Sequence, residues 1–172
     1  MAIDDEHFRT FFGAHPAGVC LVTAAGPGGE PAGLTTSAVI PASMVPPLLV
    51  IGVGNSSRTL EAIRHSGGFA VNFLAARTEW LSQRFAGKGD DKFAGLEWTP
   101  SEHAAGAPVL EAPLLSAVAE CTVYQEVPAG DHRVFLGLIE SATLFGNEPI
   151  LYHNRAYVHL PVPALSGTAT AD

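Results

Sequence analysis

The sequence predicts a mostly β protein, a β-barrel with antiparallel or mixed strands and short helices. Two observations support this fold class. Seven or so strand-like apolar segments follow one another along the 172 residues, and only short helical segments separate them. A parallel βαβ sheet needs crossover connections of roughly a dozen or more residues, which do not fit this pattern. We expect one domain over residues 1–160, because a chain of this length can bury a proper core.

Strands dominate the first third of the chain. A short amphipathic helix is expected at residues 4–13, with its phenylalanines on the inner side. Strands are expected at 15–24 and from Gly33 onward, and the glycine-rich stretch "AGPGGEPAG" between them predicts a turn. The prolines of "PASMVPP" break the strand pattern before a buried strand at 48–54.

The segment "NSSRTLEAIRHSGG" is the clearest helix in the sequence. Ser56 or Ser57 can cap its first N–H groups. Leu60 and Ile63 are expected on its inner face, and Gly67 is a natural stop. The segment "FAVNFL" then predicts a strand. A second helix is expected in "TEWLSQRFAG", capped by its first threonine and ended by its last glycine.

Long strands are expected in the second half. Residues 88–106 are polar and rich in turn formers, whereas 115–127 and 134–145 are typical of strands and are joined by "PAGDHR". A last strand is expected near Tyr157. The final stretch "PVPALSGTATAD", residues 161–172, is expected to be a disordered tail.

Charge and composition limit the possible partners. The net charge is −8, whereas nucleic-acid binding needs a basic surface, so this class is not expected. The acidic N-terminus lacks a signal-peptide pattern, and no run of about 18 apolar residues could span a bilayer, so we expect a cytoplasmic protein. Cys20 and Cys121 lie in apolar strand segments and fit buried, reduced thiols. The apolar fraction of 47% favours burial of some surface in an oligomer.

Two segments could together bind an anion. On a strand, Thr35 and Ser37 of "GLTTSAV" project from one face and Thr36 from the other. The helix that begins near Ser57 offers backbone N–H groups at its start. An anion bound there would offset the unfavourable position of Arg58 at the positive end of the helix dipole. The same residues also fit an ordinary helix cap and ordinary strand threonines.

Two further segments carry groups that could contact a ligand. His132 of "PAGDHR" stands where a strand begins and could point into a cleft, although it also fits a surface turn. The segment "RFAGKGDDKFAG" could place Lys88 and Lys92 in a basic lid over a phosphorylated ligand. Alternatively, its lysines are solvated and its phenylalanines belong to the core. No metal ligand or catalytic side chain is assigned, because the histidines lack metal-site spacing and no G-x-S-x-G elbow occurs.

Together these segments resemble the short-chain flavin reductase family, whose members are FMN-binding split barrels of the Greek-key type. Such reductases supply reduced flavin to two-component monooxygenases. The resemblance runs from about Phe8 to Tyr157 and rests on the order and spacing of its pieces, among them "HPAGVCLVTA", "GLTTSAV", "NSSRTLEAI", "FAVNFL", "RFAGKGDDKFAG", "GDHRVFLGLIE" and "PILYHNRAY". The "FAGKGDDKFAG" and "GDH" elements look most similar to reductases that serve antibiotic-pathway or aromatic monooxygenases.

The resemblance implies a flavin site and a nicotinamide site. Matching positions along the flavin are Thr35, Thr36, Ser37 and Ala38. Its phosphate would be held by Ser57, Arg58 and Thr59. Its outer side would be covered by Phe85, Ala86, Gly87 and Lys88. The nicotinamide nucleotide would be held by His132 and Tyr157. Pro41 and Val45 depart from the family pattern, and Pro41 removes a backbone N–H donor near the expected flavin ring.

The activity implied by this resemblance is NAD(P)H-dependent reduction of FMN or FAD. NADH or NADPH would deliver a hydride to the flavin, while the protein holds and orients the two rings. The family also implies a homodimer and a separate monooxygenase that receives the reduced flavin. Two alternatives use the same residues: a non-catalytic flavin-binding or carrier protein, and a split-barrel oxidoreductase whose fixed flavin acts on an organic substrate.

Overall fold

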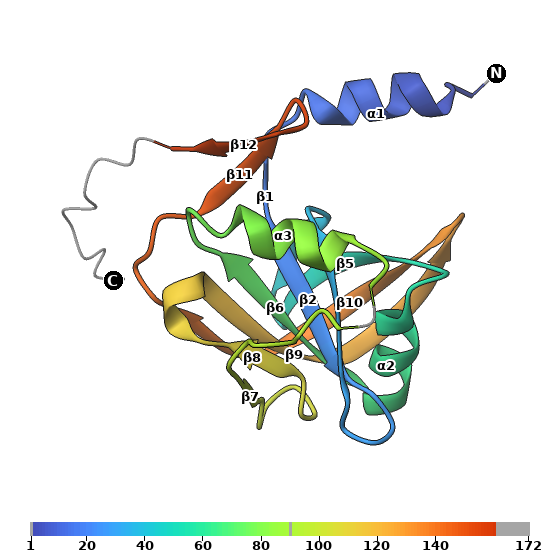
Figure 1. Ribbon diagram of the computed structural model, residues 1–172. Helices are drawn as coiled ribbons and strands as arrows, with labels where there is room; N and C mark the ends of the chain where they lie inside the picture. Colours follow the sequence, from blue (N-terminus) through green and yellow to red (C-terminus); the bar gives the residue numbers. More distant parts are fainter. Residues whose placement is uncertain (1, 90, 161–172) are drawn as a thin grey trace.

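A curved antiparallel sheet forms the body of the protein, seen in Figure 1 in a computed structural model that describes residues 2–89 and 91–160. Its seven strands lie in the order β3-β2-β6-β9-β10-β5-β4. Because β2 lies beside β6 and β5 beside β10, the chain leaves the sheet and returns to it, as in a Greek key. The strands are β2 (Cys20–Ala25), β3 (Pro31–Thr36), β4 (Val39–Met44), β5 (Pro47–Gly54), β6 (Gly68–Leu74), β9 (Leu115–Ala129) and β10 (His132–Leu144).

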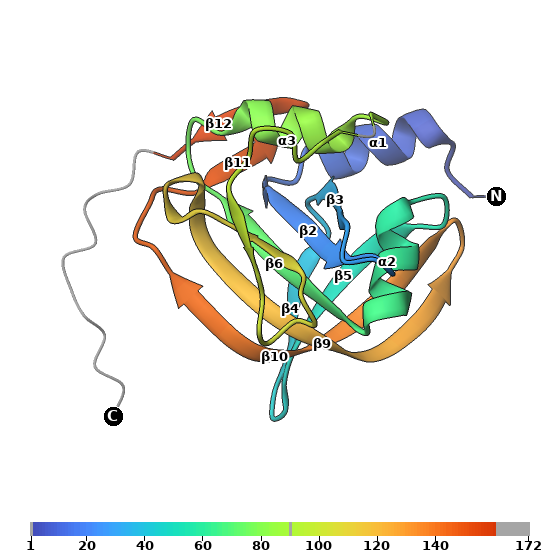
Figure 2. The same ribbon diagram turned by 60° about the horizontal axis from the view of Figure 1, so that its bottom comes forward.

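This sheet curls into a barrel that stays open along one side. Its two edge strands, β3 and β4, are separated in the chain by only Ser37 and Ala38, so the two edges come together at this link. The N–H of Gly52 on β5 donates to the carbonyl of Ala38 at 3.2 Å and anchors the link. Among the described strands no ladder joins β3 to β4. Figure 2 shows the long strands β9 and β10 curving around the barrel. The predicted mostly β split barrel is confirmed.

Two hydrophobic cores lie on opposite faces of the central strands β2, β6 and β9. Cys20 and Val22 point into one core, and Leu21 between them points into the other. Since both faces of β2 are covered, its apolar residues run continuously instead of alternating with polar ones. Cys20 and Cys121 are buried and neither forms a disulfide, as expected. Burial raises the pKa of each thiol to about 12.

Helix α2 (Arg58–Ser66) covers the first core. Ser57 caps it by accepting a hydrogen bond from the N–H of Thr59 at 3.2 Å. Its Leu60 and Ile63 are buried in the core, which confirms the predicted inner face. Gly67 ends the helix with a φ of 73°, a left-handed conformation that suits glycine.

Helix α3 (Glu79–Ala86) covers the second core with Leu81 and Phe85. Its boundaries agree with the prediction, but Thr78 does not cap it with its side chain. The Thr78 hydroxyl instead donates to the carbonyl of Ala75 at 2.7 Å, in the chain that leads into the helix. The next residue after the helix is Gly87, where the extended backbone begins.

Helix α1 (Asp5–Gly13) stands apart from the seven-stranded sheet, next to the hairpin of β11 and β12 (Figure 1). The expectation that its phenylalanines face inward is wrong. Phe8, Phe11 and Phe12 are 52%, 65% and 55% exposed, and their rings contact one another. The amphipathic sequence correctly predicts a helix, but among the residues that the structure describes no core lies against its apolar side.

A second, small sheet joins the two ends of the described chain. It pairs β1 (Ala17–Gly18) with β11 (Ile150–His153), and β11 with β12 (Ala156–His159). The strand expected at 15–24 is therefore divided between two sheets, and β11 was not predicted. The tail expected at 161–172 lies outside the described residues.

Two more differences involve turns and prolines. The stretch 88–106, expected to be polar and rich in turns, contains the unpredicted strand β7 (Trp98–Pro100), which pairs with β8 (Pro108–Leu110), and the short helix η1 (Ala112–Leu114) follows. Strand β4 runs through Pro41, where a pattern break was expected. An edge strand tolerates proline because one side of its backbone needs no ladder hydrogen bonds.

Within the described residues no helix is long and apolar enough to cross a membrane.

Candidate functional site

A cavity of about 850 Å³ is enclosed by the open side of the barrel and the ends of two helices. Small-molecule and cofactor sites have volumes of roughly 300–1,000 Å³. Its walls are β3 with the turn before it, the end of β5, the start of α2, the end of α3 with the loop that follows, and the start of β10. The predicted site residues that line it are Thr35, Thr36, Ser57, Arg58, Thr59, Phe85, Ala86, Gly87, Lys88 and His132.

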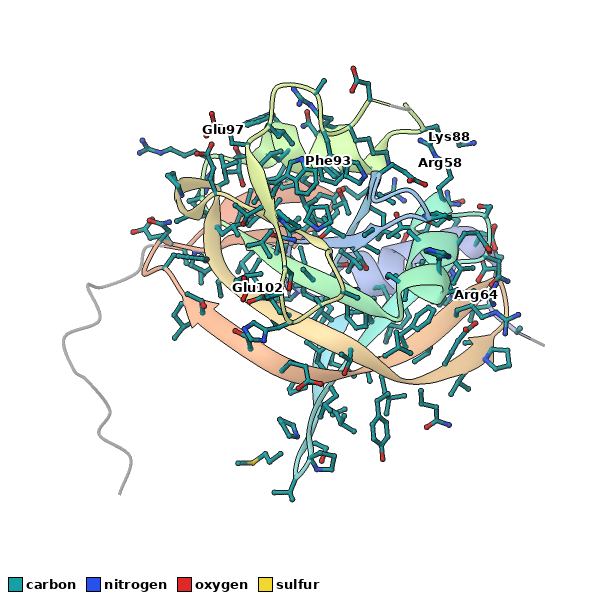
Figure 3. The ribbon with its side chains drawn as sticks, turned by 90° about the horizontal axis from the view of Figure 1, so that it is seen from below. Arg58, Arg64, Lys88, Phe93, Glu97 and Glu102 are labelled. Carbon is teal, nitrogen blue, oxygen red and sulfur yellow. The ribbon has the colours of Figure 1, made fainter. Side chains whose placement is uncertain are left out.

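Three cations line the cavity, Arg58 at the start of α2 and Lys88 and Lys92 in the loop after α3, although the chain carries a net charge of −8. The carboxylates of Glu30 and Glu61 also line it. Figure 3 shows Arg58 and Lys88 at the same edge of the molecule. Burial, and secondly the charge of Arg58, lower the pKa of Lys92. An anion bound beside these cations and the helix N-terminus would be stabilised by both.

The outer wall of the cavity is formed by residues 85–88, 92 and 93. Lys92 fastens it: its Nζ donates to the carbonyl of Phe85 at 2.7 Å and to the carbonyl of Gly33 on β3 at 3.2 Å. The rings of Phe85 and Phe93 meet edge to face, with centroids 4.9 Å apart. Phe85 is buried, so it serves the core with its ring and the cavity wall with its backbone.

The floor of the cavity is the end of β3. The Thr35 hydroxyl donates to the backbone carbonyl of Ser82 in α3 at 2.6 Å, and the Thr36 hydroxyl accepts from the N–H of Ala38 at 3.0 Å. Strand β3 ends at Thr36, and Ser37 lies in the link to β4. The alternation of faces therefore does not extend from Thr35 to Ser37, which corrects the prediction that these two hydroxyls share a strand face.

His132 lines the cavity where β10 begins opposite Gly54. Its Nδ1 is 2.8 Å from the Asp131 carboxylate, and this hydrogen bond holds the pKa of Asp131 below its usual range. The side-chain amide of Asn55, which lies between β5 and α2, donates to the carbonyl of Gly130 at 3.1 Å. The β9–β10 turn is thus tied to the residues just before α2. This contact brings His132 to the same cavity as the helix N-terminus.

Ser37, Ala38 and Tyr157 are not among the described residues that line this cavity. Ala38 adjoins it through Gly52: a Cβ added to Gly52 would lie 3.5 Å from that of Ala38. Tyr157 lies on β12, and its hydroxyl donates to the Ser82 hydroxyl at 2.9 Å.

Several lining residues were missed by the sequence prediction. Gly52 and Gly54 expose bare backbone of β5 to the cavity, and Gly33, Lys92 and Phe93 complete its floor and outer wall. The repeated glycines of "GVG" in an otherwise apolar strand were an available signal, because glycine in a strand often marks close approach of a ligand or backbone. Lys92 lies in the segment that suggested a basic lid, but nothing local distinguishes it from a solvated lysine.

Comparison with known proteins relates most of the chain to one group. The model of a family described as flavin reductase like domain matches residues 12–161. The flavin reductase (NADH) of Kitasatospora aureofaciens is 40% identical over 162 residues, which cover 93% of this chain and 84% of that protein.

Two solved structures have the same fold. A nitrilotriacetate monooxygenase component B homologue from Mycobacterium thermoresistibile has a TM-score of 0.85 and 30% identity, over 98% of this chain and 93% of that one. The NADH:FAD oxidoreductase of Streptomyces globisporus, solved in complex with NAD and FAD fragments, has a TM-score of 0.84 and 30% identity, over 96% and 99% of the two chains.

Proposed function

We infer that this chain, which belongs to the flavin reductase-like domain family, is a flavin reductase that supplies reduced flavin to a separate monooxygenase. Its relatives include a reductase named for NADH and a component of a monooxygenase system. In such a system one protein reduces the flavin and another uses it. These relatives do not favour a non-catalytic carrier or a fixed-flavin oxidoreductase.

The single observation in this molecule that best supports a flavin nucleotide is the arrangement of the cavity. Arg58 and Lys88, with the start of α2, suit the phosphate that FMN and FAD both carry. Gly54, whose carbonyl accepts from the N–H of the cap residue Ser57 at 3.0 Å, and Gly52 before it on β5 present no side chains, which leaves room for a planar ring beside the phosphate site. The residues present therefore fit the group that the family implies.

Bound flavin would supply the ring system that can take up a hydride from the nicotinamide. The residues of this chain bind and orient the two nucleotides. Ser57, Arg58 and Thr59 hold the flavin phosphate. The strand end from Thr35 to Ala38 lies along the flavin, and the stretch from Phe85 to Lys88 covers its outer side. Among these contacts, the backbone N–H groups and the cations give most of the affinity for the phosphate.

His132 holds the nicotinamide nucleotide. Hydride transfer between two rings needs no acid or base, so a proton-transfer role is not required of this side chain. Its hydrogen bond to Asp131 fixes the ring with Nδ1 turned away, which leaves Nε2 as the atom that can bond to a ligand. Tyr157 is also assigned to this nucleotide on the resemblance alone. We propose NADH as the donor, because the reductases of Kitasatospora and Streptomyces described above are both named for it.

We further propose that the protein is a homodimer in the cytoplasm, where NADH is available. The exposed phenylalanines of α1 and the tip of the β4–β5 hairpin, where Met44 is 90% and Val45 is 92% exposed, are unusual apolar surfaces for a monomer. Figure 2 shows this hairpin projecting from the barrel. Light scattering on a sizing column tests the proposal: a dimer mass is expected, and a monomer mass at micromolar concentration would contradict it.

A steady-state assay tests the function. NADH oxidation is followed by absorbance, with and without added FMN, FAD or riboflavin, and is repeated with NADPH. We expect turnover that depends on flavin and saturates in both substrates. In a second experiment, an oxygen-consuming flavin monooxygenase is placed behind a dialysis membrane. Its activity shows whether reduced flavin reaches it by diffusion. Tight flavin binding without turnover from either nicotinamide would contradict the reductase and favour a carrier.

A further inference from the structure

The outer wall of the cavity contains both lysines of the chain, Lys88 and Lys92. They lie in different surroundings. Lys88 is exposed, whereas Lys92 is partly buried between the wall and the floor. A charged amine is costly to remove from water unless hydrogen bonds compensate it. The position of Lys92 is therefore the feature of this wall that most needs an explanation.

The contacts of Lys92 supply a mechanical explanation. Its ammonium group has three donors, and two of them point to backbone carbonyls, those of Phe85 at 2.7 Å and Gly33 at 3.2 Å. Phe85 lies in the last turn of α3, and Gly33 lies in the edge strand β3. One side chain therefore joins the loop after α3 to both structural elements that border the cavity on this side.

The neighbouring side chains make this junction tight. A Cβ on Gly33 would lie 2.7 Å from the Phe85 ring and 3.2 Å from the Phe93 ring, so the two rings rest directly on the strand backbone. Arg84 Nη1 donates to the carbonyl of Ala94 at 3.0 Å and fixes the other end of the wall. Between these points, Lys92 ties the wall to β3 and α3, and the Arg58 guanidinium ties it to α2 by donating to the carbonyl of Gly89 at 3.1 Å.

We propose that Lys92 is a positioning residue for flavin binding, which holds the outer wall against β3 and α3 at the spacing that the flavin ring requires. This role rests on the proposed function of the cavity. Lys92 acts through the backbone of Phe85 and Gly33, whereas Lys88 acts through its charge on the phosphate. The two lysines should therefore differ in which part of the flavin they affect.

Titration of flavin fluorescence separates the two roles. FMN carries the phosphate and riboflavin lacks it, so we compare Kd for both ligands in Lys92→Met and Lys88→Met. For Lys92→Met, loss of two charge-assisted hydrogen bonds is expected to raise the Kd of riboflavin by about tenfold, and the Kd of FMN by at least as much because a cation beside the phosphate is lost as well. Lys88→Met should raise the Kd of FMN alone. If Lys92→Met affects FMN alone, or neither ligand, the positioning role is wrong.

Hydrogen exchange without ligand gives a second, independent readout. In Lys92→Met, the amides of residues 86–89 and 91–95 should exchange faster than in the wild type, while those of α2 stay unchanged. Unchanged exchange in the wall would overturn the proposal. If Lys92→Met fails to fold, Lys92→Gln keeps an N–H donor and should show the same changes at smaller size. Failure of the wild type to bind any flavin would contradict the proposed function instead, and the exchange experiment would still test the fastening.

Discussion

Tyr157 and Ser82 connect the carboxyl-terminal hairpin to the cavity floor. The Tyr157 hydroxyl donates to the Ser82 hydroxyl at 2.9 Å, and the backbone carbonyl of the same serine accepts from Thr35 at 2.6 Å. Ser82 is buried in α3, so one residue links β12 on one side to β3 on the other. The hairpin and the cavity floor are therefore parts of one hydrogen-bonded unit.

Removing the Tyr157 hydroxyl is expected to weaken this unit. Tyr157→Phe should cost about 0.5–1.5 kcal/mol of stability, because the buried serine loses a donor. For a domain of this size about 1 kcal/mol lowers Tm by roughly 2–4 °C, which thermal denaturation can measure. Tyr124→Phe is the control, since Tyr124 is 57% exposed. An equal Tm would show that the bond contributes nothing, and a raised KM for NADH would support the nicotinamide contact implied by the resemblance.

The role of Arg58 can be tested by comparing flavins with and without phosphate. Arg58→Ala should weaken FMN binding by about 1–3 kcal/mol and leave riboflavin binding nearly unchanged, because a charge-assisted contact to phosphate is lost. Arg58→Lys retains the charge and should retain most of the FMN affinity. Fluorescence titration of the two variants with FMN and with riboflavin, at low and high salt, measures these affinities. A similar loss for riboflavin would mean that Arg58 supports the cavity wall rather than the phosphate.

The role of His132 can be tested through the KM for the nicotinamide substrate. His132→Ala should raise KM for the nicotinamide substrate more than it raises the Kd for flavin, since the side chain lines the cavity at the start of β10 and the flavin phosphate is assigned to Ser57, Arg58 and Thr59. His132→Gln, which keeps a polar side chain, should be less affected. Steady-state kinetics and flavin titration on the same preparations give the comparison. Unchanged nicotinamide kinetics would remove His132 from the proposed site.

Gly33→Ala tests how closely the outer wall packs on β3. The added Cβ would lie 2.7 Å from a ring carbon of Phe85, which is fully buried and has little room to withdraw. Overpacking of this kind typically costs about 1–3 kcal/mol, so urea denaturation should show a lower midpoint. Gly52→Ala is the matched control, because its Cβ would make only an ordinary contact at 3.5 Å. It should keep its stability and bind flavin less tightly, since the methyl group occupies the cavity end.

The pair of Arg64 and Glu126 gives a pH-dependent contribution to stability. Arg64 Nη2 donates to the Glu126 carboxylate at 2.6 Å, and this hydrogen bond lowers the pKa of Glu126 below its ordinary value of 4.5. A carboxyl with a lowered folded pKa stabilises the protein above its unfolded pKa, and this contribution is lost as the pH falls through the folded pKa. Glu126→Gln should therefore cost up to about 1 kcal/mol near pH 7.

The same variant should approach the wild type in acid. Urea denaturation at pH 7 and at successively lower pH values below 4.5 measures the difference. Glu61→Gln is a useful comparison, because Glu61 contacts Arg64 at the longer distance of 3.3 Å and is more exposed. A difference that stays constant with pH would show that the Glu126 charge is not the source of the stabilisation.

By itself, the sequence determined the features that depend on near neighbours. Ser57 as cap, Gly67 as stop and the inner face of α2 follow from capping and helical period, which act within a few residues. The central strands and the long β9–β10 hairpin follow from apolar runs and turn residues. The combined pattern also identified the family, and with it ten of the residues that line the cavity.

Tertiary structure decided which polar groups meet. Thr35 bonds to a carbonyl 47 residues away, Tyr157 to a hydroxyl 75 residues away, and Lys92 to Gly33 across 59 residues. Nothing in the local sequence sets these partners, because the choice depends on how α3 docks against the barrel edge. Helix α1 is a second case in which packing decided the outcome. Its amphipathic pattern predicts the helix, but the pattern does not say what the apolar side packs against, and in the described residues Phe8, Phe11 and Phe12 are exposed. Local propensity specifies elements, whereas hydrogen-bond partners and buried faces are specified only when those elements pack.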